Sequence, residues 1–290
     1  MIRWPPELIL DLARRRALLV LGAGISRNSV NAAGQHPPLW DEFLKKAIVN
    51  AGKSKAWQNT VGSLIRDNDY LTACDVIKSA MGPAPFRQFM RAEFLTPGYQ
   101  HATIHDTLIK IDTRIVLTPN YDKIYENRIN ALQNNTVTVK NYYEQDVAEA
   151  IRMPGRIVLK AHGSIDTPGD VIFTRTDYAL ARQKYRTFYF ILDALAATHT
   201  FLFLGCGLND PDIRLMLEDH AFRSLHFMPH YMVLSRSAVK NHVVGSLEQS
   251  LGLKMLLFDP KNNYQELHDS LDDLATQVDV RRQTLTIAEW

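Results

Sequence analysis

Three polar side chains with the chemistry to cleave a bond to a sugar follow short apolar stretches of the sequence: Asn120, Asp122 and His162. The amide of Asn120 can position a ribose hydroxyl or an attacking water, and the imidazole of His162, which titrates near neutral pH, can act as a general base. Cleavage of a bond between a ribose and a base passes through an oxocarbenium-like state, which groups of these types stabilise. These residue types are therefore compatible with hydrolysis of an N-glycosidic bond.

A glycine-rich turn could hold the phosphates of the same substrate. The apolar stretch 17–21 runs directly into this turn, whose expected pyrophosphate ligands are Gly22, Ala23, Gly24 and Ser26. Because glycine has no Cβ, we expect Gly22 and Gly24 to adopt positive φ and to let a pyrophosphate reach the backbone amides. Arg27 replaces the third glycine of the Gly-x-Gly-x-x-Gly pattern, so the turn alone fits a structural tight turn as well as a dinucleotide site.

Three more apolar stretches, residues 114–117, 156–160 and 200–204, each end in a polar or glycine-bearing turn. These turns carry, in chain order, Asn120 with Asp122, His162, and Gly205 with Gly207. In an open parallel sheet, ligands bind beyond the carboxyl ends of the strands, so the four turns should converge on one crevice. We therefore expect an α/β fold, Rossmann-like and doubly wound, with a mainly parallel sheet.

The order of these motifs resembles that of the sirtuin catalytic core. The sequence has Gly-Ala-Gly-Ile-Ser, then Asn-Tyr-Asp, then His-Gly-Ser, then a Gly-x-Gly turn, and the resemblance runs from about Ala17 to residues 231–234. More narrowly, residues 38–40 (Pro-Leu-Trp) and 208–212 (Leu-Asn-Asp-Pro-Asp) are similar to the bacterial sirtuin-like NADases of anti-phage defence systems.

The resemblance implies an NAD+ hydrolase that releases nicotinamide and ADP-ribose, an anti-phage effector that depletes NAD+ when it is activated. It implies that Asn120 and His162 are catalytic and that Asp122 binds the carboxamide of nicotinamide. It also implies that Gly205 and Gly207 contact the ribose of adenosine.

Three departures argue against the deacylase sirtuins. Those enzymes carry a four-cysteine zinc module, whereas this chain has only Cys74 and Cys206, so we expect no zinc site. Pro119 replaces the glutamine that normally precedes the key asparagine, and residues 29–34 replace the usual Ser-Gly-Ile-Pro segment. Both changes make chemistry on acyl-lysine peptides doubtful.

Each candidate side chain also has a structural interpretation. Asn120 and Asp122 could cap the helix that follows them, and His162 could be a structural histidine. We expect Cys206 to pack rather than to act as a nucleophile, and Trp40 to lie in the core. At the level of function, the alternatives are an NAD-dependent deacylase or ADP-ribosyltransferase, and a module that binds NAD or ADP-ribose without catalysis.

The composition shows no strong charge bias. Of 290 residues, 46% are hydrophobic and 22% charged, and the net charge is +2, which gives no global attraction to nucleic acid or membrane. Two cysteines fit a reducing compartment, and residues 1–6 lack the apolar run of a signal peptide. Asp193 and His199 interrupt the most apolar segment, residues 187–208. We therefore expect a cytoplasmic enzyme that does not span a membrane.

The pattern predicts a single sirtuin-like domain over residues 1–290 with an α-helical insert at residues 40–95. The segment 81–85 (Met-Gly-Pro-Ala-Pro) should break the insert, because proline opposes helical conformation in the residue before it. Other helices are expected at residues 122–132, 178–198, 211–222 and 264–277.

Uncontrolled hydrolysis of NAD+ would be lethal to a host cell, so we expect activity to be controlled from outside this domain. Little sequence follows Asn262 for a ligand-sensing domain. The family resemblance implies a separate partner, such as a HerA-type ATPase or a short Argonaute, together with a homo-oligomer. Large apolar side chains of the insert either form an interface or pack internally: Trp57, Phe86, Phe89, Met90 and Phe94.

Overall fold

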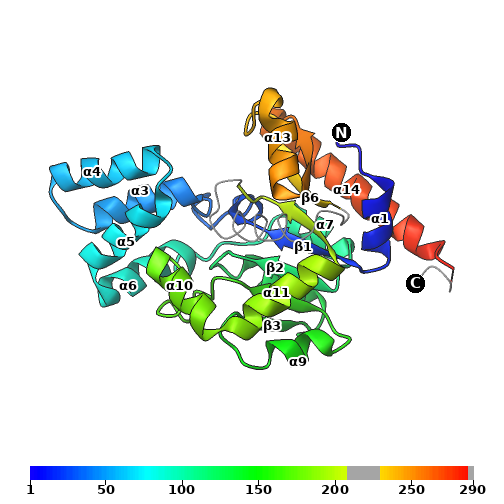
Figure 1. The fold of residues 1–290 in the computed structure, drawn as a ribbon, viewed down its shortest axis with the longest axis horizontal. Coiled ribbons are helices and arrows are strands. Elements are labelled where there is room, and N and C mark those ends of the chain that lie inside the picture. The colour runs from blue at the N-terminus through cyan, green and yellow to red at the C-terminus, as the bar shows by residue number, and fades with distance from the viewer. Residues whose placement is uncertain (208–228, 287–290) are drawn as a thin grey trace.

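A seven-stranded sheet forms the centre of the protein (Figure 1). The structure is a computed structural model that describes residues 1–207 and 229–286. Within them the strand order is β3-β4-β2-β1-β5-β6-β7, and all neighbouring strands are parallel. The strands are β1 (Ala17–Leu21), β2 (Ile115–Thr118), β3 (Thr138–Asn141), β4 (Ile157–Lys160), β5 (Thr200–Leu204), β6 (His230–Ser235) and β7 (Leu253–Phe258). The predicted doubly wound α/β fold is therefore confirmed.

Helices cover both faces of this sheet because its strands are apolar on both faces. In β1, Leu19 and Leu21 pack into one hydrophobic cluster, while Leu18 and Val20 pack into another on the opposite face. The first cluster lies under α1 (Pro6–Ala13), α7 (Thr103–Lys110), α8 (Ile124–Leu132) and α14 (Lys261–Gln283). The second lies under α9 (Val147–Arg152), α10 (Arg175–Lys184), α11 (Arg186–Thr198) and α13 (Asn241–Leu251).

Four helices between β1 and β2 form a separate layer at the end of the molecule away from the chain termini (Figure 1). They are α3 (Trp40–Asn50), α4 (Lys55–Arg66), α5 (Tyr70–Met81) and α6 (Pro83–Phe94). Gly82, with φ of +76°, and Pro83 separate α5 from α6 at the predicted break. The core of this layer also includes Tyr121, Ile165 and Phe173, so the insert packs directly against the turns that end β2 and β4.

The large apolar side chains of the insert pack internally. Phe86, Phe89 and Met90 are at most 5% exposed, and Trp57 and Phe94 are partly buried against the same cluster. Internal packing, one of the two alternatives, therefore accounts for Phe86, Phe89 and Met90, and an oligomer interface on the insert stays a prediction.

Other elements differ from the prediction. The helix expected at residues 178–198 is two helices, since Tyr185 between α10 and α11 has a non-helical ψ of 44°. The edge strand β3 was missed because no side chain in it is fully buried, which leaves no apolar run to detect. The helix expected at residues 211–222 lies outside the described residues. No described helix is long and apolar enough to cross a bilayer.

Candidate active site

The register of the sheet aligns the turns that carry the candidate residues. Thr118 of β2 pairs with Lys160 of β4, and Leu21 of β1 pairs with Leu204 of β5. The pair Val20–Leu117, one position earlier, aligns these two pairs in one row across the four strands. Asn120 and His162 each lie two residues beyond this row, and Gly22 and Gly205 lie one residue beyond it. Neighbouring strands are about 4.8 Å apart, so these turns meet at one edge of the sheet. This edge includes the boundary between β1 and β5, where the chain changes direction across the sheet, which is where open α/β sheets bind ligands.

The glycine turn after β1 packs against the turn after β5. The amide of Gly22 donates to the carbonyl of Leu204 at 2.9 Å, and the amide of Gly24 donates to the carbonyl of Gly205 at 2.9 Å. A Cβ on Gly22 would lie 2.5 Å from the Gly205 oxygen, and a Cβ on Gly24 would lie 2.9 Å from the Gly205 Cα. Both glycines are thus required by the close approach of two backbones.

The expectation of positive φ at Gly22 and Gly24 is wrong. Gly22 has φ of −91°, and Gly24 lies within the short helix α2 (Ala23–Ser26). The left-handed residue of this contact is Gly205, with φ of +67°. The sequence pattern identified the turn but could not show that its partner on β5 carries the unusual backbone conformation.

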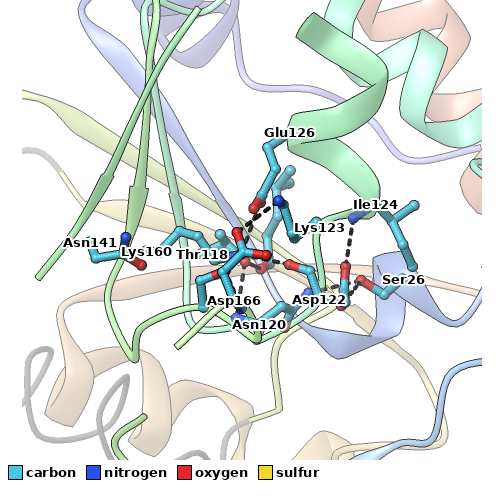
Figure 2. Close-up of polar contacts among 12 residues, drawn as sticks. Ser26, Thr118, Asn120, Asp122, Lys123, Ile124, Glu126, Asn141, Lys160 and Asp166 are labelled. Atoms are coloured by element: carbon cyan, nitrogen blue, oxygen red, sulfur yellow. Dashed lines mark hydrogen bonds and ion pairs between the residues drawn. The ribbon is translucent and has the colours of Figure 1, made fainter. Parts of the chain in front are cut away.

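A hydrogen-bonded chain of side chains links the turn after β1 to the turn after β2 (Figure 2). Asn120 Nδ2 donates to Ser26 Oγ at 3.0 Å, and the Ser26 hydroxyl donates to Asp122 Oδ2 at 2.8 Å. Asp122 Oδ1 accepts from the amide of Ile124, the first residue of α8, at 3.0 Å. Asp122 therefore binds the first amide of α8 from the position before its N-cap Lys123, and Ser26 orients the Asn120 amide.

His162 lies in an aromatic pocket at the end of β4. Its side chain is buried, with the Tyr178 ring of α10 edge-on at 5.5 Å and the Tyr121 ring at 6.5 Å. The His162 carbonyl accepts from the Ile172 amide at 3.0 Å, and Gly163 turns the chain with φ of +82°. These contacts hold the imidazole out of bulk water beside the turn that carries Asn120.

A buried ion pair beneath the site was missed at the level of sequence. Lys160 Nζ lies 2.8 Å from Glu126 Oε2 and donates to the backbone carbonyl of Asp122 at 2.6 Å (Figure 2). Burial raises the pKa of Glu126, and the Lys160 ammonium opposes that rise. A lysine that ends a strand normally reaches solvent, so only the burial of both partners reveals this pair.

The remaining candidates have simpler surroundings. Trp40 lies in an aromatic cluster, with its ring 5.7 Å from that of Phe173, and Cys206 is buried with its Sγ 3.6 Å from the Val20 carbonyl, so both pack as expected. Gly207 is exposed, and residues 208–212, which carried part of the family resemblance, lie outside the described residues. Within residues 1–207 and 229–286, no three His, Cys, Asp or Glu residues group as a metal site would require.

Comparisons with known proteins show what this region is similar to. A family model for the SIR2-like domain matches residues 114–256. The chain is 30% identical over 141 residues to the NAD(+) hydrolase ThsA of Enterococcus faecium, covering 48% of this chain and 29% of that protein. It is 23% identical over 206 residues to Defense-associated sirtuin 2 of Bacillus subtilis, covering 70% of this chain and 19% of that protein.

A second NAD(+) hydrolase ThsA, from Acinetobacter baumannii (strain 532279), is 28% identical over 115 residues, which cover 39% of this chain and 23% of that protein. The chain thus spans less than a third of the length of these relatives. The SIR2-like match includes Asn120, Asp122 and His162 but begins after the glycine turn of residues 22–26.

The packing of the two turns predicts that Gly22→Ala lowers the free energy of unfolding by about 1–3 kcal/mol, because the new Cβ would overlap the Gly205 backbone. Urea unfolding measures this loss. Gly155→Ala is the matched control, since no atom lies within 4 Å of a Cβ at that position. Its expected change is within about 0.5 kcal/mol. An equal fall in the free energy of unfolding for Gly22→Ala and Gly155→Ala would show that the turns do not pack as described.

Proposed function

We propose that this chain, which carries a SIR2-like domain over residues 114–256, hydrolyses NAD+ to nicotinamide and ADP-ribose. The strongest support is the position of Asn120 and His162. Thr118 and Lys160 pair at the ends of β2 and β4, and Asn120 and His162 each lie two residues beyond them. An amide and an imidazole at that edge, next to a turn of glycines, suit a dinucleotide whose scissile bond joins ribose to a base.

In the proposed reaction, the bond between ribose C1′ and the nicotinamide nitrogen breaks, and its electron pair leaves with nicotinamide. Water attacks C1′, and His162 accepts the proton that the water loses. Asn120, held by Ser26, positions the water or a ribose hydroxyl. Since a carboxylate offers about four lone-pair sites and the bonds from Ser26 and Ile124 use only two, the Asp122 carboxylate can still accept a bond from the nicotinamide carboxamide.

The glycine turns would hold the remainder of the dinucleotide. The amides of Gly22 and Gly24 already donate to the carbonyls of Leu204 and Gly205 at the end of β5. These two glycines would therefore contribute by having no side chain where the pyrophosphate approaches. The direct phosphate contact then falls to the amide of Ala23. Ser26, whose hydroxyl donates to Asp122, would border the pyrophosphate without donating to it. Gly205 and Gly207 would border the ribose of adenosine.

We further propose a role in anti-phage defence, in which the activated protein depletes cytoplasmic NAD+. The names of the ThsA hydrolases and of Defense-associated sirtuin 2 support this role. Because NAD+ loss is toxic, we propose a homo-oligomer whose activity is switched by a separate partner, such as a HerA-type ATPase or a short Argonaute. Such a partner can switch the enzyme only through different affinities for its active and inactive states.

Product analysis tests the proposed function directly. The full chain is incubated with NAD+, alone and with an acyl-lysine peptide, and the products are separated by chromatography. The hydrolase releases nicotinamide and ADP-ribose without any acceptor. Turnover that requires the peptide would indicate a deacylase or a transferase, and NAD+ binding without turnover under any condition would indicate a binding module.

We expect Asn120→Ala and His162→Ala to lower the rate of NAD+ hydrolysis by about two to four orders of magnitude without unfolding the protein, because each removes a positioned polar or acid–base group. Matched controls are Asn127→Ala on α8 and His242→Ala on α13, which replace exposed residues of the same types and should retain the wild-type rate. Full activity in either site variant would remove that residue from the mechanism.

We expect the isolated chain to form a closed homo-oligomer and to hydrolyse NAD+ slowly until a partner binds, since identical interfaces let one contact bias several sites. Light scattering at several protein concentrations gives the oligomeric state. NAD+ consumption is measured in parallel, with and without co-expressed products of neighbouring genes. A monomer that hydrolyses NAD+ at the full rate alone would contradict both parts of this prediction.

A further inference from the structure

The buried ammonium of Lys160 connects three parts of the candidate site. Lys160 ends β4, two residues before His162, and its side chain is fully buried. Its Nζ lies 2.8 Å from Glu126 Oε2 on α8 and 2.6 Å from the carbonyl oxygen of Asp122 in the turn after β2 (Figure 2). One cation therefore links the strand that carries His162 to the turn that carries Asn120.

Stability alone does not account for this arrangement. Two buried charges lose their hydration, and apolar residues of similar volume often give the same stability or more. What an apolar pair could not provide is the hydrogen bond from the ammonium to the Asp122 carbonyl, which fixes the backbone of the turn. Glu126 balances the charge that this bond requires within the core.

A second ion pair, Lys123 to Asp166, joins the same two loops at 2.7 Å, but Asp166 is 54% exposed. Water and salt screen such a pair, so it restrains the loops only weakly. The buried contact of Lys160 is therefore the stronger restraint on the turn.

We propose that Lys160 is a positioning residue for NAD+ hydrolysis, whose ammonium holds the Asp122 carbonyl and thereby sets Asn120 relative to His162. This inference rests on the proposed function. Lys160 does not touch the substrate; it determines where the residues that do so lie. A displacement of about 1 Å in such residues lowers a rate by about 100-fold.

Two variants separate positioning from a contribution to folding alone. Lys160→Met leaves Glu126 buried without its partner, so the midpoint of urea unfolding falls. Lys160→Met combined with Glu126→Leu removes the pair as a whole, and the midpoint returns to the wild-type range. Both variants lack the bond to the Asp122 carbonyl.

Positioning predicts that the double variant regains stability but not activity. Its kcat stays about 10- to 100-fold below wild type, with little change in KM, because binding of NAD+ depends less on this geometry than the reaction does. A double variant with wild-type kcat and wild-type stability would overturn the proposal, since the pair would then serve folding alone.

Lys140→Met is the matched control. Lys140 lies in β3 and pairs with Glu144 and Asp146. Strand β4 separates β3 from β2, whose turn carries Asn120. Replacement of this partly buried, ion-paired lysine should leave kcat unchanged. An equal fall in kcat in Lys140→Met and Lys160→Met would overturn the specific role of Lys160.

Hydrogen exchange provides a readout that does not require NAD+ turnover. In the wild type, the Asn120 amide donates to Thr118 Oγ1 and the Ile124 amide donates to Asp122 Oδ1. In the double variant both amides should exchange at least about 10-fold faster although the global stability is restored. If the wild type hydrolyses no NAD+, the proposed function fails on that result. Unchanged exchange would independently overturn the positioning role.

Discussion

The common register of β4, β2, β1 and β5 is the constraint on which the candidate site depends. Parallel pairing places the carboxyl ends of these strands in one row, so turns that are more than 180 residues apart in sequence, such as those at Gly22 and Gly205, become neighbours. A slip of one residue in a strand would exchange its two faces and move its turn out of line. Because each face of the sheet packs against its own set of helices, such a slip would also disrupt the side-chain packing on both faces.

Polar and backbone contacts then join the aligned turns in pairs. Gly22 donates to Leu204 between β1 and β5, and the Thr118 hydroxyl donates to the Leu21 carbonyl at 2.7 Å between β2 and β1. Between β4 and β2, the Lys160 ammonium donates to the Asp122 carbonyl. The site is thus held by contacts that each span two strand ends, which is the kind of rigid support that catalytic geometry requires.

Short sequence patterns predicted the strands and the helix break that neighbouring residues determine. Apolar stretches that end in polar turns identified the core strands, and the glycine–proline pair at residues 82–83 identified the break in the insert. The features that sequence reasoning missed arise from distant contacts. The left-handed conformation belongs to Gly205 because of its packing against the β1 turn, and the burial of Lys160 requires Glu126, 34 residues earlier.

We propose that the dinucleotide binds across the carboxyl ends of β1, β2, β4 and β5. A crystal structure of the full chain carrying His162→Ala, with NAD+ bound and not turned over, would show where it binds. We expect the pyrophosphate beside the turns of Gly22 and Gly205, and the nicotinamide ribose between Asn120 and position 162. A dinucleotide bound at any other edge or face of the protein would contradict this proposal.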